Sequence, residues 1–201
     1  MLVKIHSETP NQRHIKFAIE ALKNGELIAY PTDTLYGLGC DMYNKSAIEA
    51  IYNFKQINRK KPLSIICHDF SQVSEFAMIS NSAFKTMKSL LPGAFTFILP
   101  STSNVPKILM TRQKTIGVRI PVNIFIKEIV KELGNPIIST TITSDSEIIM
   151  SDPFEIEKKY SHIISIIFHD DTSFKDPSTI IDLTEDEIEI LREGSGDINE
   201  F

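Results

Sequence analysis

Polar side chains crowd into one short segment, Tyr30-Pro-Thr-Asp-Thr-Leu-Tyr-Gly-Leu-Gly-Cys40, directly after an apolar stretch. Two hydroxyls, a carboxylate, a phenol and two glycines follow one another closely: Thr32, Asp33, Thr34, Tyr36, Gly37 and Gly39. Glycine permits a sharp turn or the close approach of another group. A loop at the end of a strand in an open α/β sheet is a common ligand site. The segment is therefore a candidate binding loop, or a rigid turn whose side chains bond their own backbone.

A single arginine lies within an apolar strand pattern, Thr115-Ile-Gly-Val-Arg-Ile-Pro121. A half-buried arginine is costly unless it is paired with an anion. Two roles for Arg119 remain open at this point. It is the partner of a carboxylate of the protein, or it receives a carboxylate or phosphate of a ligand.

A group of cations occupies the segment Lys55-Gln-Ile-Asn-Arg-Lys-Lys-Pro-Leu63. Arginine neutralises phosphate oxygens through two parallel hydrogen bonds, and lysine does so as a point charge. The segment is a candidate phosphate-binding loop or a solvated basic loop.

Further hydroxyls fall in Ile138-Ser-Thr-Thr-Ile-Thr-Ser144, where five of seven residues carry one. They are ligand-binding groups or the solvent-facing side of a threonine-rich strand. Ser178 precedes one apolar strand pattern and Arg192 ends the next. These two side chains are candidates for the same cavity.

The pattern along the chain alternates between helices and strands. Apolar spacing predicts helices over residues 11–24, 46–54, 82–91 and 124–133. Strands are expected over residues 27–30, 63–67, 95–99, 116–120, 136–142, 163–168, 179–183 and 188–191. This alternation predicts an α/β fold, a single domain over residues 1–201. The close spacing of the last strands predicts antiparallel pairs and therefore a mixed sheet.

Composition and charge narrow the class of protein. Of the 201 residues, 42% are hydrophobic and 23% are charged, as in folded globular proteins and unlike disordered or fibrous chains. Residues 1–144 carry 17 Lys and Arg against 10 Asp and Glu, whereas residues 145–201 carry 4 against 16. The first part could thus present a positive surface to phosphates. The alternative is that these charges are solvated on opposite faces.

The sequence lacks the motifs that are typical of several classes of protein. No apolar run approaches the ~20 residues of a membrane helix, and no signal peptide is seen. Cys40 and Cys67 lack C-x-x-C spacing and the five histidines lack metal-ligand spacing, so we expect no disulfide scaffold and no protein-held metal. The chain also lacks the G-x-S-x-G, Walker and G-x-G-x-x-G motifs. A cytoplasmic protein that contacts no membrane is expected.

Taken in order, these segments resemble the YrdC-like family of threonylcarbamoyl-AMP synthases. The similarity runs from the helix at Asn11 to Gly194, and residues 30–39 carry its most specific motif. Supporting motifs are Lys61-Pro-Leu63, Pro92-Gly-Ala-Phe-Thr96, Ile116-Gly-Val-Arg-Ile-Pro121, Ser178-Thr-Ile-Ile-Asp-Leu183 and Leu191-Arg-Glu-Gly194. The resemblance implies a twisted, open mixed sheet with flanking helices and a concave positive surface.

The resemblance also implies an activity and a site. Such a nucleotidyltransferase joins ATP, held with Mg²⁺, to L-threonine and bicarbonate, forming threonylcarbamoyl-AMP and pyrophosphate for tRNA modification. Threonine would be held by Thr34, Arg119 and Ser178, and the nucleotide by Lys55, Lys61, Thr115, Ser139, Thr141 and Arg192. Lys55 and Arg119 would be the catalytic residues, with Thr32, Asp33 and Tyr36 supporting the loop.

Two positions depart from the family pattern. Ile57 stands where the family has arginine, and Thr143 where it has asparagine. These departures and the Leu191–Asp197 ending are more similar to the YciO branch than to the YrdC branch. Two other functions therefore stay open: a non-catalytic module that binds double-stranded RNA or tRNA, and a hydrolase of the adenylate or of modified tRNA.

Overall fold

A ten-stranded mixed sheet forms the centre of this computed structural model, which describes residues 1–57, 62–144, 148–171, 176–185 and 187–200. The strand order is β1-β8-β2-β3-β7-β4-β6-β5-β9-β10. The strands are β1 (Leu2–Lys4), β2 (Leu27–Tyr30), β3 (Gly37–Asp41), β4 (Ser64–Ile66), β5 (Phe95–Pro100), β6 (Thr115–Arg119), β7 (Ile137–Thr141), β8 (Ile164–His169), β9 (Thr179–Asp182) and β10 (Glu189–Arg192). The helices of the described residues are α1 (Gln12–Lys23), α2 (Lys45–Lys55), α3 (Phe70–Phe76), α4 (Asn81–Leu90), α5 (Ile124–Leu133) and α6 (Pro153–Tyr160), with 3₁₀ turns η1 (Lys107–Leu109) and η2 (Ile198–Glu200). Parallel and antiparallel pairs both occur, which confirms the predicted α/β class and mixed sheet.

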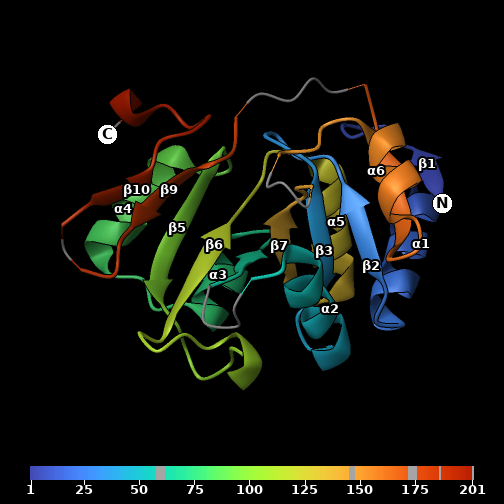
Figure 1. The fold of residues 1–201 in the computed structure, drawn as a ribbon. Helices are drawn as coiled ribbons and strands as arrows, with labels where there is room; N and C mark the ends of the chain where they lie inside the picture. The colour runs from blue at the N-terminus through green and yellow to red at the C-terminus, as the bar shows by residue number, and fades with distance from the viewer. Residues whose placement is uncertain (58–61, 145–147, 172–175, 186, 201) are drawn as a thin grey trace.

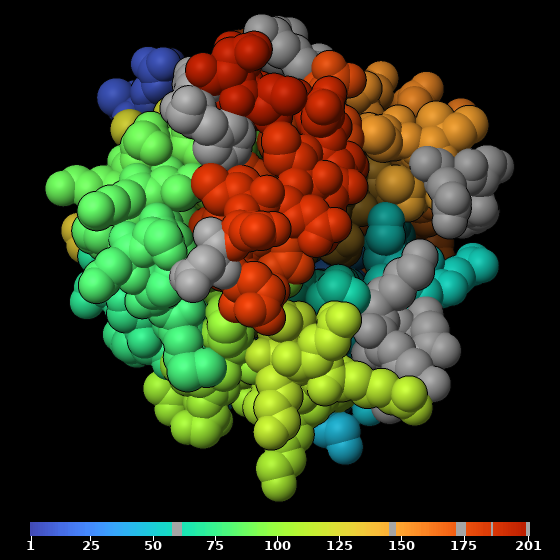
Figure 2. Space-filling view, turned by 90° about the vertical axis from the view of Figure 1, so that its left-hand side faces the viewer, coloured from blue at the N-terminus to red at the C-terminus, as the bar shows by residue number. Residues whose placement is uncertain are grey.

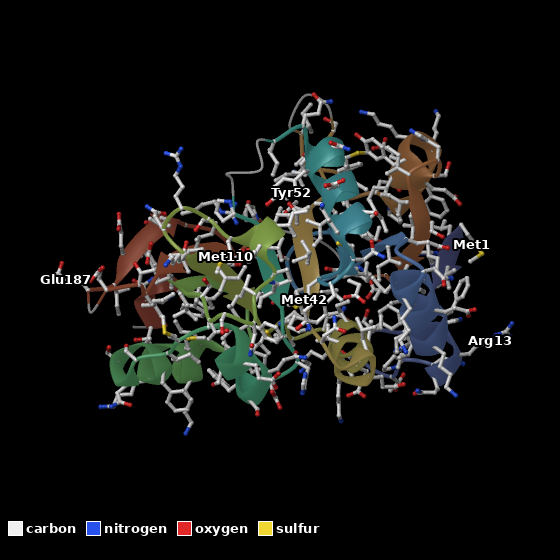
Figure 3. The ribbon with its side chains drawn as sticks, turned by 90° about the horizontal axis from the view of Figure 1, so that it is seen from below. Met1, Arg13, Met42, Tyr52, Met110 and Glu187 are labelled. Carbon is white, nitrogen blue, oxygen red and sulfur yellow. The ribbon has the colours of Figure 1, made fainter. Side chains whose placement is uncertain are left out.

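The sheet is open, and its two edge strands lie near the two ends of the chain. β1 forms one edge and β10 the other, so the termini lie on opposite sides of the molecule (Figure 1). β9 and β10 pair antiparallel, as their close spacing predicted. Glu187 projects at the tip of this hairpin, while Arg13 on α1 lies at the opposite end (Figure 3). Part of the acidic C-terminal region is thus used for the last strands and their exposed turn.

Alternation along the strands divides the buried residues between two clusters. In β2, Leu27 and Ala29 belong to one cluster, and Ile28 and Tyr30 belong to the other. Successive strand residues point to opposite faces, which explains the division. The first cluster is completed by α2, α3, α4 and α6, and the second by α1 and α5. In Figure 1, α2 lies in front of the central strands and α5 behind them.

Helix α1 shows why the predicted helices form where they do. Its buried residues Ile15, Ala18, Ile19 and Leu22 recur at helical spacing, and the Asn11 side chain accepts a hydrogen bond from the backbone N–H of Arg13. This cap satisfies a donor that the first turn leaves open. None of the helices in the described part of the chain is long and apolar enough to cross a membrane.

Four elements lie outside the sequence prediction: β1, β3, α3 and α6. β1 has three residues and α3 and α6 have seven and eight, too few for a periodic signal. The expectation of a loop over residues 37–40 is wrong, because β3 is a strand paired with β2 and β7. An ideal Cβ at Gly37 or Gly39 would lie 2.7 or 2.8 Å from the Tyr30 ring. The ring therefore packs where side chains of β3 would be, and close approach is the role of both glycines.

Candidate anion-binding site

A cavity of about 210 Å³ opens where β2 ends, and most of its lining is polar. Its walls come from the segment after β2, from β4 to β7 and from the C-terminal hairpin. The lining residues are Thr32, Thr34, Leu35, Tyr36, Gly37, Pro62, Leu63, Ser64, Ile66, Thr96, Arg119, Ser139, Thr140, Thr141, Ser178, Ile180 and Arg192. The red C-terminal segment in Figure 2, which supplies Ser178 and Arg192, lies between the green and orange parts of the chain.

Small side chains give the cavity its floor. Ser139 in β7 lies opposite Gly39 on one side and Ser64 of β4 on the other, and Ser64 lies opposite Gly117. Residues directly opposite one another across a sheet project from the same face. The small side chains of Ser64 and Ser139 thus border the cavity, whereas the space over Gly39 is filled by the Tyr30 ring.

Arg119 forms an ion pair with Asp33 at one wall of the cavity. Its Nη2 lies 2.6 Å from Asp33 Oδ1, and the two side chains are 13% and 14% exposed. Asp33 Oδ2 and Arg119 Nε have no hydrogen-bond partner among the described residues. Of the two roles open for Arg119, the structure shows the carboxylate partner. The guanidinium still lines the cavity, so a ligand contact remains available to it.

Arg192 is held within the C-terminal segment of the cavity lining by hydrogen bonds to Ser178. Its Nε and Nη2 donate to the Ser178 carbonyl at 3.1 and 2.7 Å, and Nη2 also lies 3.3 Å from Ser178 Oγ. Thr96 Oγ1 lies 2.9 Å from the same Ser178 hydroxyl. Burial and the charge of Arg119 lower the pKa of Arg192. Burial is the larger cause of the lowered pKa, and the smaller contribution from Arg119 reflects repulsion between the two guanidinium groups.

The charge balance of the cavity favours an anion. Its lining includes two guanidinium groups, and the described residues supply one carboxylate, Asp33, as an ion-pair partner. An anion placed between Arg119 and Arg192 would relieve their repulsion, and its hydrogen bonds would be charge-assisted.

The Thr32 hydroxyl makes its hydrogen bonds within the segment after β2. The Thr32 hydroxyl donates to the Leu35 carbonyl at 2.7 Å, which uses its one proton. Its oxygen also accepts from the backbone N–H groups of Thr34 and Leu35, so the Thr34 hydroxyl, 3.1 Å away, is not required to donate to it. Thr34 lines the cavity, and its hydroxyl can accept a hydrogen bond from a ligand amine or hydroxyl.

The structure brings together most of the site residues that the sequence suggested. Eight of them line the cavity: Thr32, Thr34, Tyr36, Arg119, Ser139, Thr141, Ser178 and Arg192. Asp33 is not among the lining residues but forms the ion pair with Arg119. Lys61, together with Arg59 and Lys60, lies outside the described residues.

Lys55 and Thr115 are not among the lining residues. The Lys55 ammonium donates to the Thr141 carbonyl at 3.0 Å and to Thr143 Oγ1 at 2.8 Å. Thr115 Oγ1 lies 3.2 Å from the hydroxyl of Thr111, in the turn before β6. Their contact with a nucleotide stays a prediction.

Three polar lining residues were not assigned to the site individually: Ser64, Thr96, which ends a family motif, and Thr140, which lies in the hydroxyl-rich segment. The sequence carried a usable signal for Thr96, which lies between Phe95 and Phe97 in an apolar strand pattern. In the structure its side chain is buried, with 6% of the residue exposed. Ser64 carried no such signal, because a serine at the start of a strand is common.

The two departures from the family pattern have structural counterparts. Ile57 packs against the first core cluster, so this position provides apolar contact. Thr143 receives a hydrogen bond from Lys55. Together, Lys55 and Thr143 connect the end of α2 to the segment after β7.

Replacing Lys55 by alanine should lower the free energy of unfolding. A hydrogen bond from a charged donor contributes about 1.5–3 kcal/mol. The Lys55 ammonium makes two, one with Thr141 at the end of β7 and one with Thr143 just beyond it. Urea unfolding measures the loss. The matched control is Lys45→Ala on the exposed start of α2, expected within about 0.5 kcal/mol of the parent. A Lys55→Ala protein with unchanged stability but weakened ATP binding would contradict the supporting role.

An open α/β sheet with a positively charged, hydroxyl-lined cavity defines a protein suited to binding a small anion or zwitterion. Comparison with known proteins identifies the family of the chain. The sequence model of the Sua5/YciO/YrdC family, described as "Telomere recombination", matches residues 20–194. The chain belongs to this family.

Individual relatives place the chain nearer one branch. It is 38% identical over 199 residues to "Uncharacterized protein YciO" of Escherichia coli (strain K12), covering 98% of this chain and 97% of the relative. The crystal structure of E. coli YciO has a TM-score of 0.94 and 37% identity, with 100% and 98% of the two chains covered. "Threonylcarbamoyl-AMP synthase" of Pseudoalteromonas translucida is 35% identical over 134 residues, covering 65% of this chain and 72% of that one. The family and the similarity to YciO are thus as predicted.

A ligand is present in one similar structure. The P. abyssi Sua5 structure complexed with L-threonine has a TM-score of 0.88 and 25% identity, and the match covers 96% of this chain and 57% of that one.

Proposed function

We propose that this protein is an ATP-dependent enzyme that forms L-threonylcarbamoyl-AMP from L-threonine, bicarbonate and ATP. The observation that carries the proposal is the presence of two guanidinium groups, Arg119 and Arg192, in the lining of one hydroxyl-rich cavity. The similarity to threonylcarbamoyl-AMP synthases and to Sua5 with L-threonine supports the choice of substrate.

The cavity suits an amino acid. Arg119 receives the threonine carboxylate, and the acceptor oxygen of Thr34 receives a hydrogen bond from the amine or hydroxyl. Ser178, held by Thr96 and Arg192, assists at the carboxylate. Small-molecule sites usually have volumes of about 300–1,000 Å³, so 210 Å³ holds an amino-acid-sized group with little room to spare. The nucleotide then extends towards the open side, near Ser139, Thr141 and Arg192.

The reaction needs positioning and charge neutralisation. The threonine amine forms an N–C bond to bicarbonate carbon and water leaves, giving a carbamate. One carbamate oxygen then bonds to the α-phosphorus of ATP, and the bond to the bridging oxygen breaks with its electrons leaving on pyrophosphate. A carboxylate is already ionised at neutral pH, so this attack needs no strong base. Holding the reactants in line and facing the phosphates with cations are the main contributions of such a site.

Mg²⁺ enters as part of the nucleotide substrate in this proposal. No group of three histidine, cysteine or carboxylate side chains suited to a metal occurs in the described part of the chain. Mg²⁺ usually keeps several waters and binds through substrate phosphates with one or two protein carboxylates.

Pyrophosphate release tests the proposal. The protein is incubated with Mg²⁺, ATP and bicarbonate, with L-threonine present, omitted or replaced by L-serine. Threonine-dependent release, with threonylcarbamoyl-AMP identified by mass spectrometry, is the expected result. ATP binding without threonine-dependent release would show that the fold serves another substrate, and the hydrolase and RNA-binding hypotheses would then be the ones to test.

A further inference from the structure

Tyr30 is a buried residue that reaches the cavity through another side chain. It is the last residue of β2, it is fully buried, and its ring packs across Gly37 and Gly39 of β3. Its hydroxyl lies 2.7 Å from Ser139 Oγ on β7, the next strand of the sheet. The ring is held in this position by close contact with the backbone of these two glycines.

The direction of this hydrogen bond follows from burial. Tyr30 has one hydroxyl proton, and Ser139 is its hydrogen-bond partner among the described residues. If Ser139 were the donor, the Tyr30 proton would be left buried without an acceptor, which is unfavourable because a buried donor without a partner loses its hydration and gains no hydrogen bond. Burial also raises the pKa of Tyr30, so the phenol keeps its proton. Tyr30 therefore donates and Ser139 accepts.

This direction leaves the Ser139 proton for the cavity. Ser139 is partly exposed and lines the cavity together with Arg119 and Arg192. Because its oxygen already accepts from Tyr30, its own O–H is directed to a different acceptor. Ser139 thus adds a hydroxyl donor to the two guanidinium groups that line the cavity.

We propose that Tyr30 is a positioning residue that makes the Ser139 hydroxyl a hydrogen-bond donor to an anionic oxygen of the ligand. Resting on the proposed function, that oxygen belongs to a phosphoryl group of the nucleotide. Tyr30 itself touches no ligand and acts through Ser139.

A double-mutant cycle tests the coupling. The parent, Tyr30→Phe, Ser139→Ala and the double variant are titrated with Mg²⁺-ATP by calorimetry, and thermal unfolding is recorded for each. Ser139→Ala should weaken binding at least about tenfold, since hydrogen bonds to charged groups contribute about 1.5–3 kcal/mol. Tyr30→Phe should weaken it about three- to tenfold, because the serine proton is then free to turn away. The double variant should bind no more weakly than Ser139→Ala.

Two controls separate positioning from packing. Ser139→Thr keeps the hydroxyl and should retain most of the affinity. Tyr52→Phe removes the same oxygen from a buried ring in the first core cluster and should leave ATP affinity unchanged. A purely structural Tyr30 would lower the unfolding temperature without changing affinity, or would change affinity equally with and without Ser139.

The outcomes distinguish this inference from the proposed function. If the parent binds no ATP, the proposed function fails, and the same cycle is measured with inorganic phosphate as the probe. Coupling between Tyr30 and Ser139 with either probe supports the inference. Independent effects, no effect of Tyr30→Phe, or no binding of either anion would overturn it.

Discussion

Replacing Arg119 by alanine is expected to abolish threonine-dependent pyrophosphate release and to destabilise the fold. The same guanidinium lines the cavity and neutralises Asp33, a carboxylate that is 14% exposed. Removing one member of a buried ion pair costs about 3–5 kcal/mol, because the other charge is left without compensation. Losing the contact to the substrate carboxylate should weaken threonine binding about ten- to a hundredfold. Calorimetric titration with L-threonine and urea unfolding measure the two effects separately.

The double variant Asp33→Ala/Arg119→Ala separates stability from binding. It has no orphaned carboxylate, so it should regain much of the stability lost in Arg119→Ala while remaining unable to bind threonine. Arg112→Ala is the matched control, since Arg112 is exposed in the turn before β6 and should affect neither property. Unchanged threonine affinity in Arg119→Ala would remove this residue from the site.

Replacing Gly194 by alanine is expected to open the C-terminal wall of the cavity. An ideal Cβ at Gly194 would overlap the carbonyl oxygen of Pro177 and the backbone of Ser178. Backbone atoms move less readily than the end of a flexible side chain, so residues 177–178 must shift. Ser178 is where Arg192 donates its hydrogen bonds. We expect a loss of about 1–3 kcal/mol in stability, together with at least about tenfold weaker binding of the proposed ligands through the lost contact.

Gly134→Ala provides the matched comparison for the strain. Gly134 ends α5 with a φ of +83°, and nothing lies within 4 Å of its ideal Cβ. Alanine there loses about 1 kcal/mol through backbone strain alone, away from the cavity. Both variants should therefore unfold more easily, but only Gly194→Ala should lose ligand affinity. Equal ligand affinity in the two would contradict the role assigned to the Gly194 contact.

Local patterns in the sequence were enough for much of the fold. The spacing of Ile15, Ala18, Ile19 and Leu22 predicts α1, and the apolar run of β5 predicts that strand, because periodicity depends on residues near one another in the chain. The polar segments that line the cavity could also be recognised locally, because a hydroxyl or an arginine within an apolar strand pattern is unusual. The family motifs drew on the same segments.

Contacts between distant segments could not be predicted in this way. The sequence left open whether Arg119 pairs with a carboxylate, and Asp33 lies 86 residues away. It suggested Lys55 for the nucleotide, which stays a prediction, but it did not indicate that the Lys55 ammonium donates to Thr141 and Thr143. Residue types and local spacing thus determined which groups were available for binding. Strand order and the twist of the sheet decided which of them meet, because burial and hydrogen bonding act between neighbours in space, as Tyr30 and Ser139 show across 109 residues.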